Sequence, residues 1–222
     1  MKKTYLAAFL VASLVLVPLL TWGQAGDLKT IKLNEPNKDR GLPVMKALSV
    51  RASAREWSDK ELSLQDLSDL LWAANGINRP DGKKTASSAM NAQDVDIYVF
   101  MKSGAYLYDA AAQALVPVLA GDNLSGIMMM RPGGPGGPPS QPPIQIILVS
   151  DISRFRMGEM PLKLEWAAID TGIVSQNISL FCAGTGLGTR PRASMDKAKI
   201  KELLKLSDTQ YPLLNHPVGY LK

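Results

Sequence analysis

Cysteine and histidine are almost absent from this chain. Its 222 residues include one cysteine, Cys182, and one histidine, His216. A single cysteine cannot form an intramolecular disulfide, and a Cys/His zinc site cannot be assembled, so no metal is expected. A Ser-His-acid triad would have to use His216, yet no G-x-S-x-G motif accompanies it. We expect Cys182 to be a small buried hydrophobe and His216 to cap or pack an extended terminal strand.

An excess of charge of one sign is also lacking. The chain has 25 basic and 20 acidic residues, a formal net charge of +5, and its basic residues form no long runs. Nucleic-acid-binding domains usually carry a basic patch or stripe, so nucleic acid is not expected as a partner. The length fits one domain with a substantial core.

The N-terminus has the pattern of a targeting segment. Lys2 and Lys3 precede an apolar run from Tyr5 to Leu20, and Gly23-Gln24-Ala25 supplies small residues. This pattern indicates a secretory signal peptide, residues 1–25, because the run is short for a membrane span. We expect a periplasmic or secreted protein of bacterial type, with no stable membrane insertion after cleavage. An uncleaved anchor is the alternative.

Residues 26–45 are polar and are expected to form an irregular N-terminal arm, and residues 46–222 one domain. Within it, Ser63 with Asp66 three positions later forms a capping box ahead of a leucine-rich helix. Gly76 is expected to end that helix in a left-handed conformation. A second long helix is predicted from Leu162 to Ala183. Its small residues would let another helix approach closely: Ala167, Ala168, Gly172, Ser175 and Ser179.

Strands are predicted between these helices. Residues 95–101 alternate in polarity, and a Ser103-Gly104 turn leads to a returning strand at 106–108, which predicts an antiparallel hairpin. Residues 144–150 form an apolar run typical of a buried strand. A short helix near 195–204 and a terminal strand complete the chain. Helices and antiparallel strands without regular βαβ alternation indicate an α+β fold.

Residues 128–143 are of low complexity. Proline and glycine make up 10 of the 13 residues from Arg131 to Pro143, a composition that does not form regular structure. The segment is either a surface loop or, with Met128–Met130, a cover over a nearby pocket.

Three short stretches could bind a ligand. In "RASAR", Arg51 and Arg55 could hold phosphate oxygens with the help of Ser53; otherwise they are exposed charge. In "SSAMNAQ", Asn91 and Gln93 offer donors and acceptors to the edge of a heteroaromatic ring; otherwise the stretch is a turn before the hairpin.

The third stretch is "GTGLGT" at 184–189. It follows a predicted helix, whereas a dinucleotide fingerprint opens one. It is therefore expected to be a glycine-rich exit loop whose backbone can approach a flat ligand, or a plain helix terminator.

Taken together and in this order, these stretches resemble the FMN-dependent nitroreductase family, from about Met45 to the end of the chain. The matching segments are "RASAR", "LLWAANGIN", Ser88 to Gln93, "GLGT", "PVGY", and a D-x-G-x-x-x-Q-N pattern. The last is formed by Asp170, Gly172, Gln176 and Asn177. The "DIYVF" and "YLYD" segments are most similar to the branch that includes thiazole- and oxazole-forming dehydrogenases.

The resemblance implies a nitroreductase-like α+β fold: a central, mostly antiparallel sheet flanked by helices. It also implies a homodimer with a long interface helix and one FMN in each of two interface sites. Arg51 and Arg55 would bind the phosphate, with Ser53 nearby. The implied ring contacts are Asn91, with Ser88 and Gln93 on the same wall, and the backbone of Gly186, Leu187, Gly188 and Thr189. Lys222 is a candidate substitute for the family's C-terminal phosphate ligands.

The resemblance therefore implies an exported oxidoreductase. Bound FMN would carry the chemistry, with no catalytic side chain required, passing hydride from a reduced donor, NAD(P)H being one candidate, to a small organic substrate such as a nitro compound or a quinone. A non-enzymatic flavin-binding or scaffold protein of the cell envelope is one alternative. An envelope adaptor that binds a partner through residues 128–143 is another.

Overall fold

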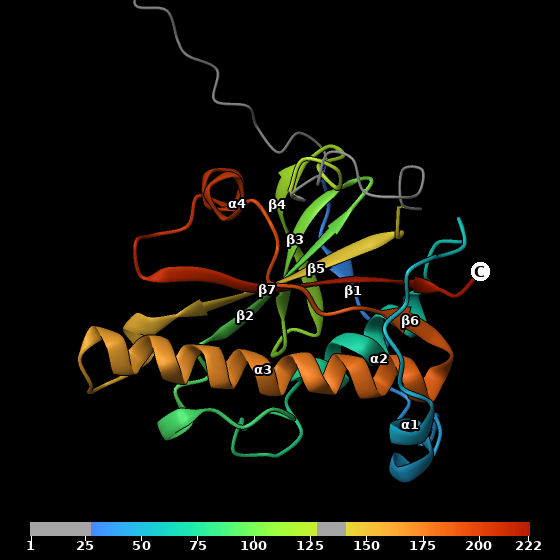
Figure 1. Ribbon diagram of the computed structural model, residues 1–222, viewed down its shortest axis with the longest axis horizontal. Coiled ribbons are helices and arrows are strands. Elements are labelled where there is room, and N and C mark those ends of the chain that lie inside the picture. The colour runs from blue at the N-terminus through green and yellow to red at the C-terminus, as the bar shows by residue number, and fades with distance from the viewer. Residues whose placement is uncertain (1–27, 128–140) are drawn as a thin grey trace, which may run out of the picture.

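The computed structural model describes residues 28–127 and 141–222. It shows one seven-stranded sheet with α1, α2 and α3 on one side and α4 on the other (Figure 1). The expected signal peptide and most of the proline- and glycine-rich segment lie outside the described residues. No helix in the described ranges is both long enough and apolar enough to cross a membrane.

The sheet is antiparallel at every ladder, in the order β1-β4-β3-β2-β5-β7-β6. Its strands are β1 Ile31–Lys32, β2 Val95–Met101, β3 Gly104–Asp109, β4 Ala114–Ala120, β5 Ile144–Asp151, β6 Leu187–Thr189 and β7 Gln210–Tyr220. The helices are α1 Val44–Val50, α2 Leu64–Asn75, α3 Met160–Thr185 and α4 Lys197–Leu204, with short 3-10 turns η1 Ala89–Asn91 and η2 Ile152–Arg154. The expected α+β class and mostly antiparallel sheet are confirmed.

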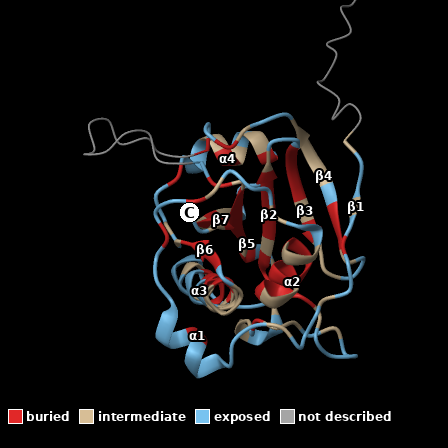
Figure 2. Ribbon diagram, turned by 90° about the vertical axis from the view of Figure 1, so that its right-hand side faces the viewer, coloured by how far each residue is buried: buried red, intermediate tan, exposed pale blue. Residues whose placement is uncertain are grey.

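Both faces of the sheet are buried, as the side-chain pattern of β2 shows. Val95, Ile97 and Val99 pack in the cluster beneath α2 and α3. Tyr98 and Phe100 pack in the cluster on the α4 side. β5 is buried from Ile144 to Ser150, as its largely apolar sequence predicts. Figure 2 shows these strands as the buried centre of the molecule.

The predicted N-cap of α2 at Ser63 is confirmed, but the Ser63 backbone N–H donates to Tyr220 Oη and does not complete a capping box with Asp66. Ser63 Oγ accepts a hydrogen bond from the Asp66 backbone N–H at 3.0 Å. The predicted role of Gly76 is wrong. Gly76 has extended backbone, with φ −76° and ψ 160°, and is not left-handed. Glycine is required there for space, because an added Cβ would lie 2.5 Å from Trp72 Cδ1. The left-handed cap occurs instead at Gly186, with φ 77°, after α3.

The long helix α3 has 26 residues and is about 39 Å long. Its small residues divide between two environments: Ala167, Ser175 and Ser179 are buried against the sheet, whereas Ala168 and Gly172 are exposed. Cys182 is buried in the core, as predicted. Three of the five small residues therefore pack within the chain, and the other two are open to solvent.

Candidate functional site

The arginine stretch lies between α1 and α2, alongside β6. Ser53 forms a parallel bridge with Thr189, and the Ala54 N–H donates to the Thr189 carbonyl at 2.9 Å. Ala54 is buried, whereas Arg51, Ser53 and Arg55 are exposed. The backbone is thus attached to the sheet edge while the three polar side chains face solvent.

The glycine-rich stretch is the strand to which these residues attach. Gly184 belongs to the last turn of α3, and Leu187–Thr189 form β6, paired with β7, where an exit loop was predicted. A Cβ on Gly188 would lie 2.5 Å from Leu221 Cδ2 and 2.9 Å from Ala54 Cβ. Glycine at 188 therefore allows the arginine stretch to approach β6. Leu221 also bridges Trp57, which places the exposed Lys222 at this end of the molecule.

Positive charge at this end lacks counter-ions. None of the ion pairs within residues 28–127 and 141–222 involves Arg51, Arg55 or Arg190. In the same ranges the Nε atom of Arg190 is buried without a hydrogen-bond partner. Burial and the charge of Arg190 lower the pKa of Arg192 to about 10. Three arginines without a carboxylate partner suit an anion. Sequence reasoning missed Arg190, although it directly follows "GLGT".

His216 supports β6 from behind. Its Nδ1 lies 3.1 Å from Thr189 Oγ1 and its Nε2 lies 2.8 Å from Ser175 Oγ on α3. Burial, reinforced by the charge of Arg192, lowers the pKa of His216 to about 3. The imidazole is therefore neutral at ordinary pH and links α3, β6 and β7, which confirms its predicted packing role.

The serine-rich loop has an unusual backbone. Met90, Asn91 and Gln93 adopt left-handed conformations, with φ of 53°, 54° and 49°. Each such residue costs on the order of 1 kcal/mol, with asparagine among the least disfavoured. The Met90 and Asn91 side chains are exposed. Such strain persists only where the surroundings hold the chain in place.

Several hydrogen bonds hold this loop. Ser88 Oγ accepts from the Gln93 backbone N–H at 2.8 Å, and Asp170 Oδ2 on α3 accepts from the Ala89 N–H at 2.8 Å. Arg154 Nη1 donates to the Gln93 carbonyl at 2.8 Å. The loop is therefore fixed to both α3 and η2, with Asn91 presented outward.

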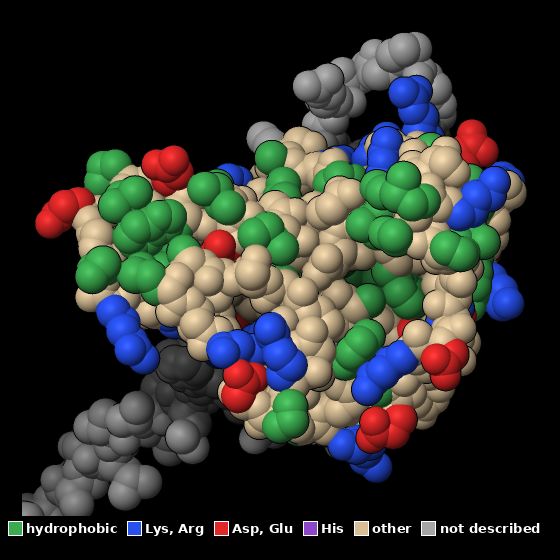
Figure 3. Space-filling model, turned by 90° about the horizontal axis from the view of Figure 1, so that it is seen from below, with side chains coloured by type: hydrophobic (Ala, Val, Ile, Leu, Met, Phe, Trp, Pro, Cys, Tyr) green, Lys and Arg blue, Asp and Glu red, His purple; other side chains and the backbone are tan. Residues whose placement is uncertain are grey.

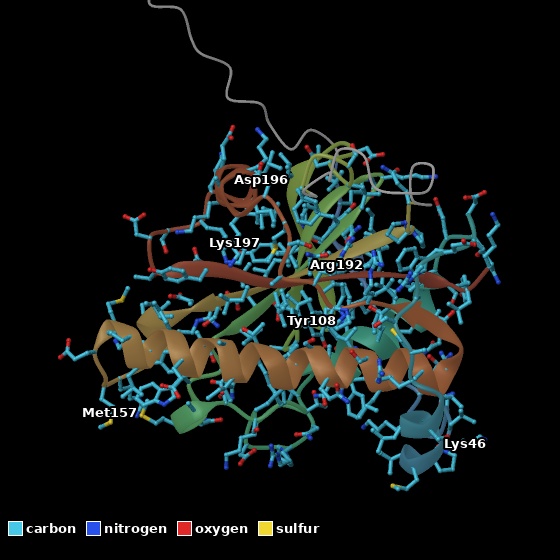
Figure 4. All side chains as sticks on the ribbon, in the orientation of Figure 1. Lys46, Tyr108, Met157, Arg192, Asp196 and Lys197 are labelled. Carbon is cyan, nitrogen blue, oxygen red and sulfur yellow. The ribbon has the colours of Figure 1, made fainter. Side chains whose placement is uncertain are left out.

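The structure does not bring all of the predicted site residues together. Arg51, Ser53 and Arg55 lie beside Gly186–Thr189, at the C-terminal end of α3. Ser88, Asn91 and Gln93 form a separate group whose anchor, Asp170, precedes Gly186 by sixteen positions, or about 24 Å of helix. In Figure 4, Lys46 on α1 lies near the C-terminal end of α3, and Met157 lies near its N-terminal end. One chain thus presents two separate groups of candidate residues.

Exposed apolar side chains gather on the surface around α3. One group belongs to α1 and the residues before it, where Met45 is 75% exposed: Leu42, Val44, Met45, Leu48 and Val50. The other lies at the start of α3: Met157, Met160, Leu162 and Ile169. Figure 3 shows apolar side chains gathered at two separate places on this side of the molecule. Exposed apolar patches of this kind mark interaction surfaces.

Comparison with known proteins identifies the relatives of this chain. The model of the nitroreductase family matches residues 48–220. "Putative nitroreductase MJ1384" of Methanocaldococcus jannaschii is 28% identical over 202 residues, covering 88% of this chain and 94% of its own length.

Two solved structures extend the comparison. A "putative nitroreductase", reut_a1228 of Ralstonia eutropha JMP134, superposes with a TM-score of 0.80 at 30% identity, over 90% of this chain and 92% of that one. A chain of the Escherichia coli microcin synthetase McbBCD complex shares the fold, with a TM-score of 0.63 at 18% identity, over 96% of this chain and 85% of that one.

Proposed function

The chain belongs to the nitroreductase family, and from that premise we propose that it is an exported, FMN-dependent oxidoreductase. Membership of the family supports a flavin-dependent oxidoreductase. The more specific parts of the proposal are FMN as the cofactor, NAD(P)H as a candidate hydride donor, and a small nitro compound or quinone as substrate. Export to the periplasm or beyond is proposed from the N-terminal sequence pattern alone.

The observation that carries the proposal is the arginine stretch attached to β6. Arg51 and Arg55 are exposed side by side with Ser53 and have no ion-pair partner in the described ranges. Arg190 adds a buried Nε without a hydrogen-bond partner there. These donors fit the phosphate of FMN, since arginine binds phosphate oxygens through charge-assisted, bidentate hydrogen bonds.

The ring-side half of the site is proposed to come from a second copy. Ser88, Asn91 and Gln93 lie about 24 Å along α3 from the residues beside β6. A homodimer that buries the two apolar patches around α3 would bring the arginine stretch of one copy close to the serine-rich loop of the other. This arrangement gives two equivalent sites between the copies, as symmetry of an isologous dimer requires.

The roles of the chain's own residues follow from this arrangement. Bound FMN supplies hydride transfer. Asn91 would orient the flavin edge through its amide, Ser88 would fix the loop that carries Asn91, and the β6 backbone would support the ring. His216, neutral and buried, would hold β6 in place and would take no proton during turnover.

Replacing the arginines one at a time tests this function. Arg51→Ala and Arg55→Ala should each weaken FMN affinity roughly ten- to a hundredfold, because a charge-assisted contact contributes about 1.5–3 kcal/mol. Riboflavin affinity should not change, since riboflavin has no phosphate. Lys197→Ala, which removes an exposed charge from α4 on the other face of the sheet, is the matched control. Affinities are measured by quenching of flavin fluorescence.

Three results would contradict the proposal. Protein incubated with excess FMN that shows no flavin absorbance would rule out the cofactor. FMN-loaded protein that gives the mass of one chain in light scattering would rule out the shared site. Bound FMN that a range of donors cannot reduce would favour a flavin-binding scaffold instead.

A further inference from the structure

Two buried carboxyl groups meet beneath the serine-rich loop. Asp94, immediately before β2, is 0% exposed, and Asp170 on α3 is 3% exposed. Both side chains line one small cavity, and the proximity of Asp170 helps to raise the pKa of Asp94. Buried carboxylates normally pair with a cation or lie in contact with water. Asp94 and Asp170 would instead both be negatively charged if ionised. The protonation state of the pair therefore needs a physical explanation.

The remaining contacts of the two carboxyl groups are unequal. Asp94 Oδ2 accepts a short hydrogen bond from Ser150 Oγ, and Asp170 Oδ2 accepts from the Ala89 N–H at 2.8 Å. Asp94 Oδ1 is buried without a partner among the described residues. A cavity of about 10 Å³, lined by both aspartates and by Ser88, adjoins them. It offers room for at most one water, so solvent does not screen the pair.

We infer that Asp94 and Asp170 share one proton, and that this proton clamps the Ser88–Gln93 loop to α3. The two aspartates are then positioning residues for the ring-side half of the site. The effect on flavin binding rests on the proposed function, whereas the shared proton does not. Protonated Asp94 donates to Asp170, and Asp170 in turn holds the Ala89 N–H, so the proton fixes the start of the left-handed segment.

The electrostatic surroundings support this assignment. Burial raises the pKa of Asp94 to about 7; the Ser150 hydroxyl opposes that change, and Asp170 adds to it. The charged groups that face the pair from neighbouring elements do not neutralise it. Arg154 on η2 pairs with Asp96 at 2.6 Å and lies 3.6 Å from Asp151.

Lys84, in the loop after α2, is half-buried, and burial lowers its pKa. Its charge therefore offers only weak compensation to Asp94. Two carboxylates in contact do not both ionise easily. Loss of the shared proton would place two negative charges in contact, separate the side chains and free the Ala89 N–H. The left-handed residues Met90, Asn91 and Gln93 would then relax.

Three amide variants test the shared proton in protein without flavin. In Asp94→Asn, Nδ2 can donate to Asp170 while Oδ1 still accepts from Ser150. In Asp170→Asn, Nδ2 can donate to Asp94 while Oδ1 still accepts from Ala89. Each single variant should therefore fold at least as stably as the parent at pH 8. The double variant turns two NH₂ groups toward each other and should be less stable than either single variant.

The pH dependence gives a second readout. The folded parent keeps a proton on Asp94 up to about pH 7, whereas an unfolded aspartate loses it near pH 4. The unfolding constant of the parent, divided by that of Asp94→Asn, should therefore rise up to about tenfold per pH unit between those values. A carboxylic-acid C=O infrared band should be present at pH 6 and absent from both single variants.

The results separate the two parts of the inference. A double variant as stable as the single ones, or no carboxylic-acid band at pH 6, would overturn the shared proton. The FMN affinity of the parent, divided by that of Asp94→Asn, should fall between pH 6 and 8.5, because the ratio cancels the titration of the FMN phosphate itself. If the band is present but FMN affinity has the same pH dependence in both proteins, the proton does not position the loop. Failure of every variant to bind FMN would count against the proposed function and leave the infrared result valid.

Discussion

The two proposed half-sites lie at different places along α3, one at its C-terminal end and the other beside Asp170, near its middle, and they are built differently. At the C-terminal end, backbone pairing with β6 holds the arginine stretch and leaves its side chains in solvent. Near the middle of α3, side chains hold a strained backbone, with Asp170 accepting from Ala89 and Ser88 from Gln93. Binding of a phosphate requires charge on a regular scaffold, whereas alignment of an amide with a ring edge requires a fixed, unusual backbone.

Each of these two regions also contains one buried titratable group whose shifted pKa favours the uncharged form. His216 lies behind β6 and stays neutral because burial disfavours its proton. Asp94 lies beneath the serine-rich loop, where burial raises its pKa to about 7 and so favours the protonated form below neutral pH. Since one is a base and the other an acid, the two groups give stability an opposite dependence on pH.

The largest predicted effect concerns how His216 and Asp94 each change stability with pH. Below about pH 6.5 the unfolded chain protonates His216 and the folded chain does not until about pH 3, so stability falls as pH falls. Asp94 makes stability fall as pH rises from about 4 to about 7. Each contributes about 1.4 kcal/mol per pH unit, and they oppose each other between about pH 4.5 and 6.5. The pKa values of Asp66 and Asp151 are lowered in the folded chain. They therefore affect the pH dependence of stability only at a lower pH than this range.

A variant that removes one of the two groups should therefore reveal the pH dependence of stability that the other group causes. From pH 6.5 to 4.5, His216→Gln should gain about 3 kcal/mol of unfolding free energy, and Asp94→Asn should lose about as much. Urea unfolding at the two pH values measures the difference. Equal slopes in the parent and both variants would show that neither buried group is held uncharged.

A smaller effect is expected from Gly188→Ala, which tests the backbone scaffold of the arginine end. The added Cβ would press on Ala54 Cβ at 2.9 Å and on Leu221, and should move the arginine stretch away from β6. We expect a loss of about 1–3 kcal/mol in stability and weaker FMN binding, although no arginine is changed. Thermal unfolding and flavin titration measure both.

The control for this variant is Gly126→Ala, where the nearest atom to an added Cβ, Asn123 O, lies 3.8 Å away. It should leave both quantities unchanged. If Gly188→Ala also has no effect, the close approach of Ala54 to β6 is not needed for the half-site.

The contrast between the two regions also explains what the sequence could predict. Local patterns gave correct results: the Ser63 cap, the alternation of β2 and the buried run of β5 all depend on neighbouring residues. The family resemblance and fold class were confirmed because several short motifs occur in a fixed order.

The errors have two causes: a close contact within one turn of helix at Gly76, and contacts between distant residues elsewhere. Gly76 was assigned a left-handed turn because glycine usually ends helices that way, whereas the side chain of Trp72 is the actual reason. The strand β6 was predicted as a loop because its pairing depends on β7 and Ser53. The meeting of Asp94 with Asp170 has no local signal, since it exists only once α3 packs beneath β2.

The smallest predicted effect concerns Asn91, whose backbone strain and side-chain function can be separated. Asn91→Gly relieves a left-handed conformation but adds freedom to the unfolded chain, so stability should rise by no more than about 1 kcal/mol. Loss of the amide should weaken flavin binding roughly three- to tenfold, since a neutral hydrogen bond contributes about 1 kcal/mol. FMN and riboflavin should be affected equally, unlike in the arginine variants.

Met90→Gly is the matched control for Asn91→Gly, because Met90 is also exposed and has φ 53°. It relieves the same kind of strain and removes no hydrogen-bonding group, so stability should rise while flavin affinity stays constant. Calorimetry and flavin titration on both variants give two independent readouts. If Met90→Gly weakens flavin binding as much as Asn91→Gly does, the strained backbone itself is what the ring requires, and the Asn91 amide has no separate role. If only Asn91→Gly weakens binding, the strain serves to present that amide.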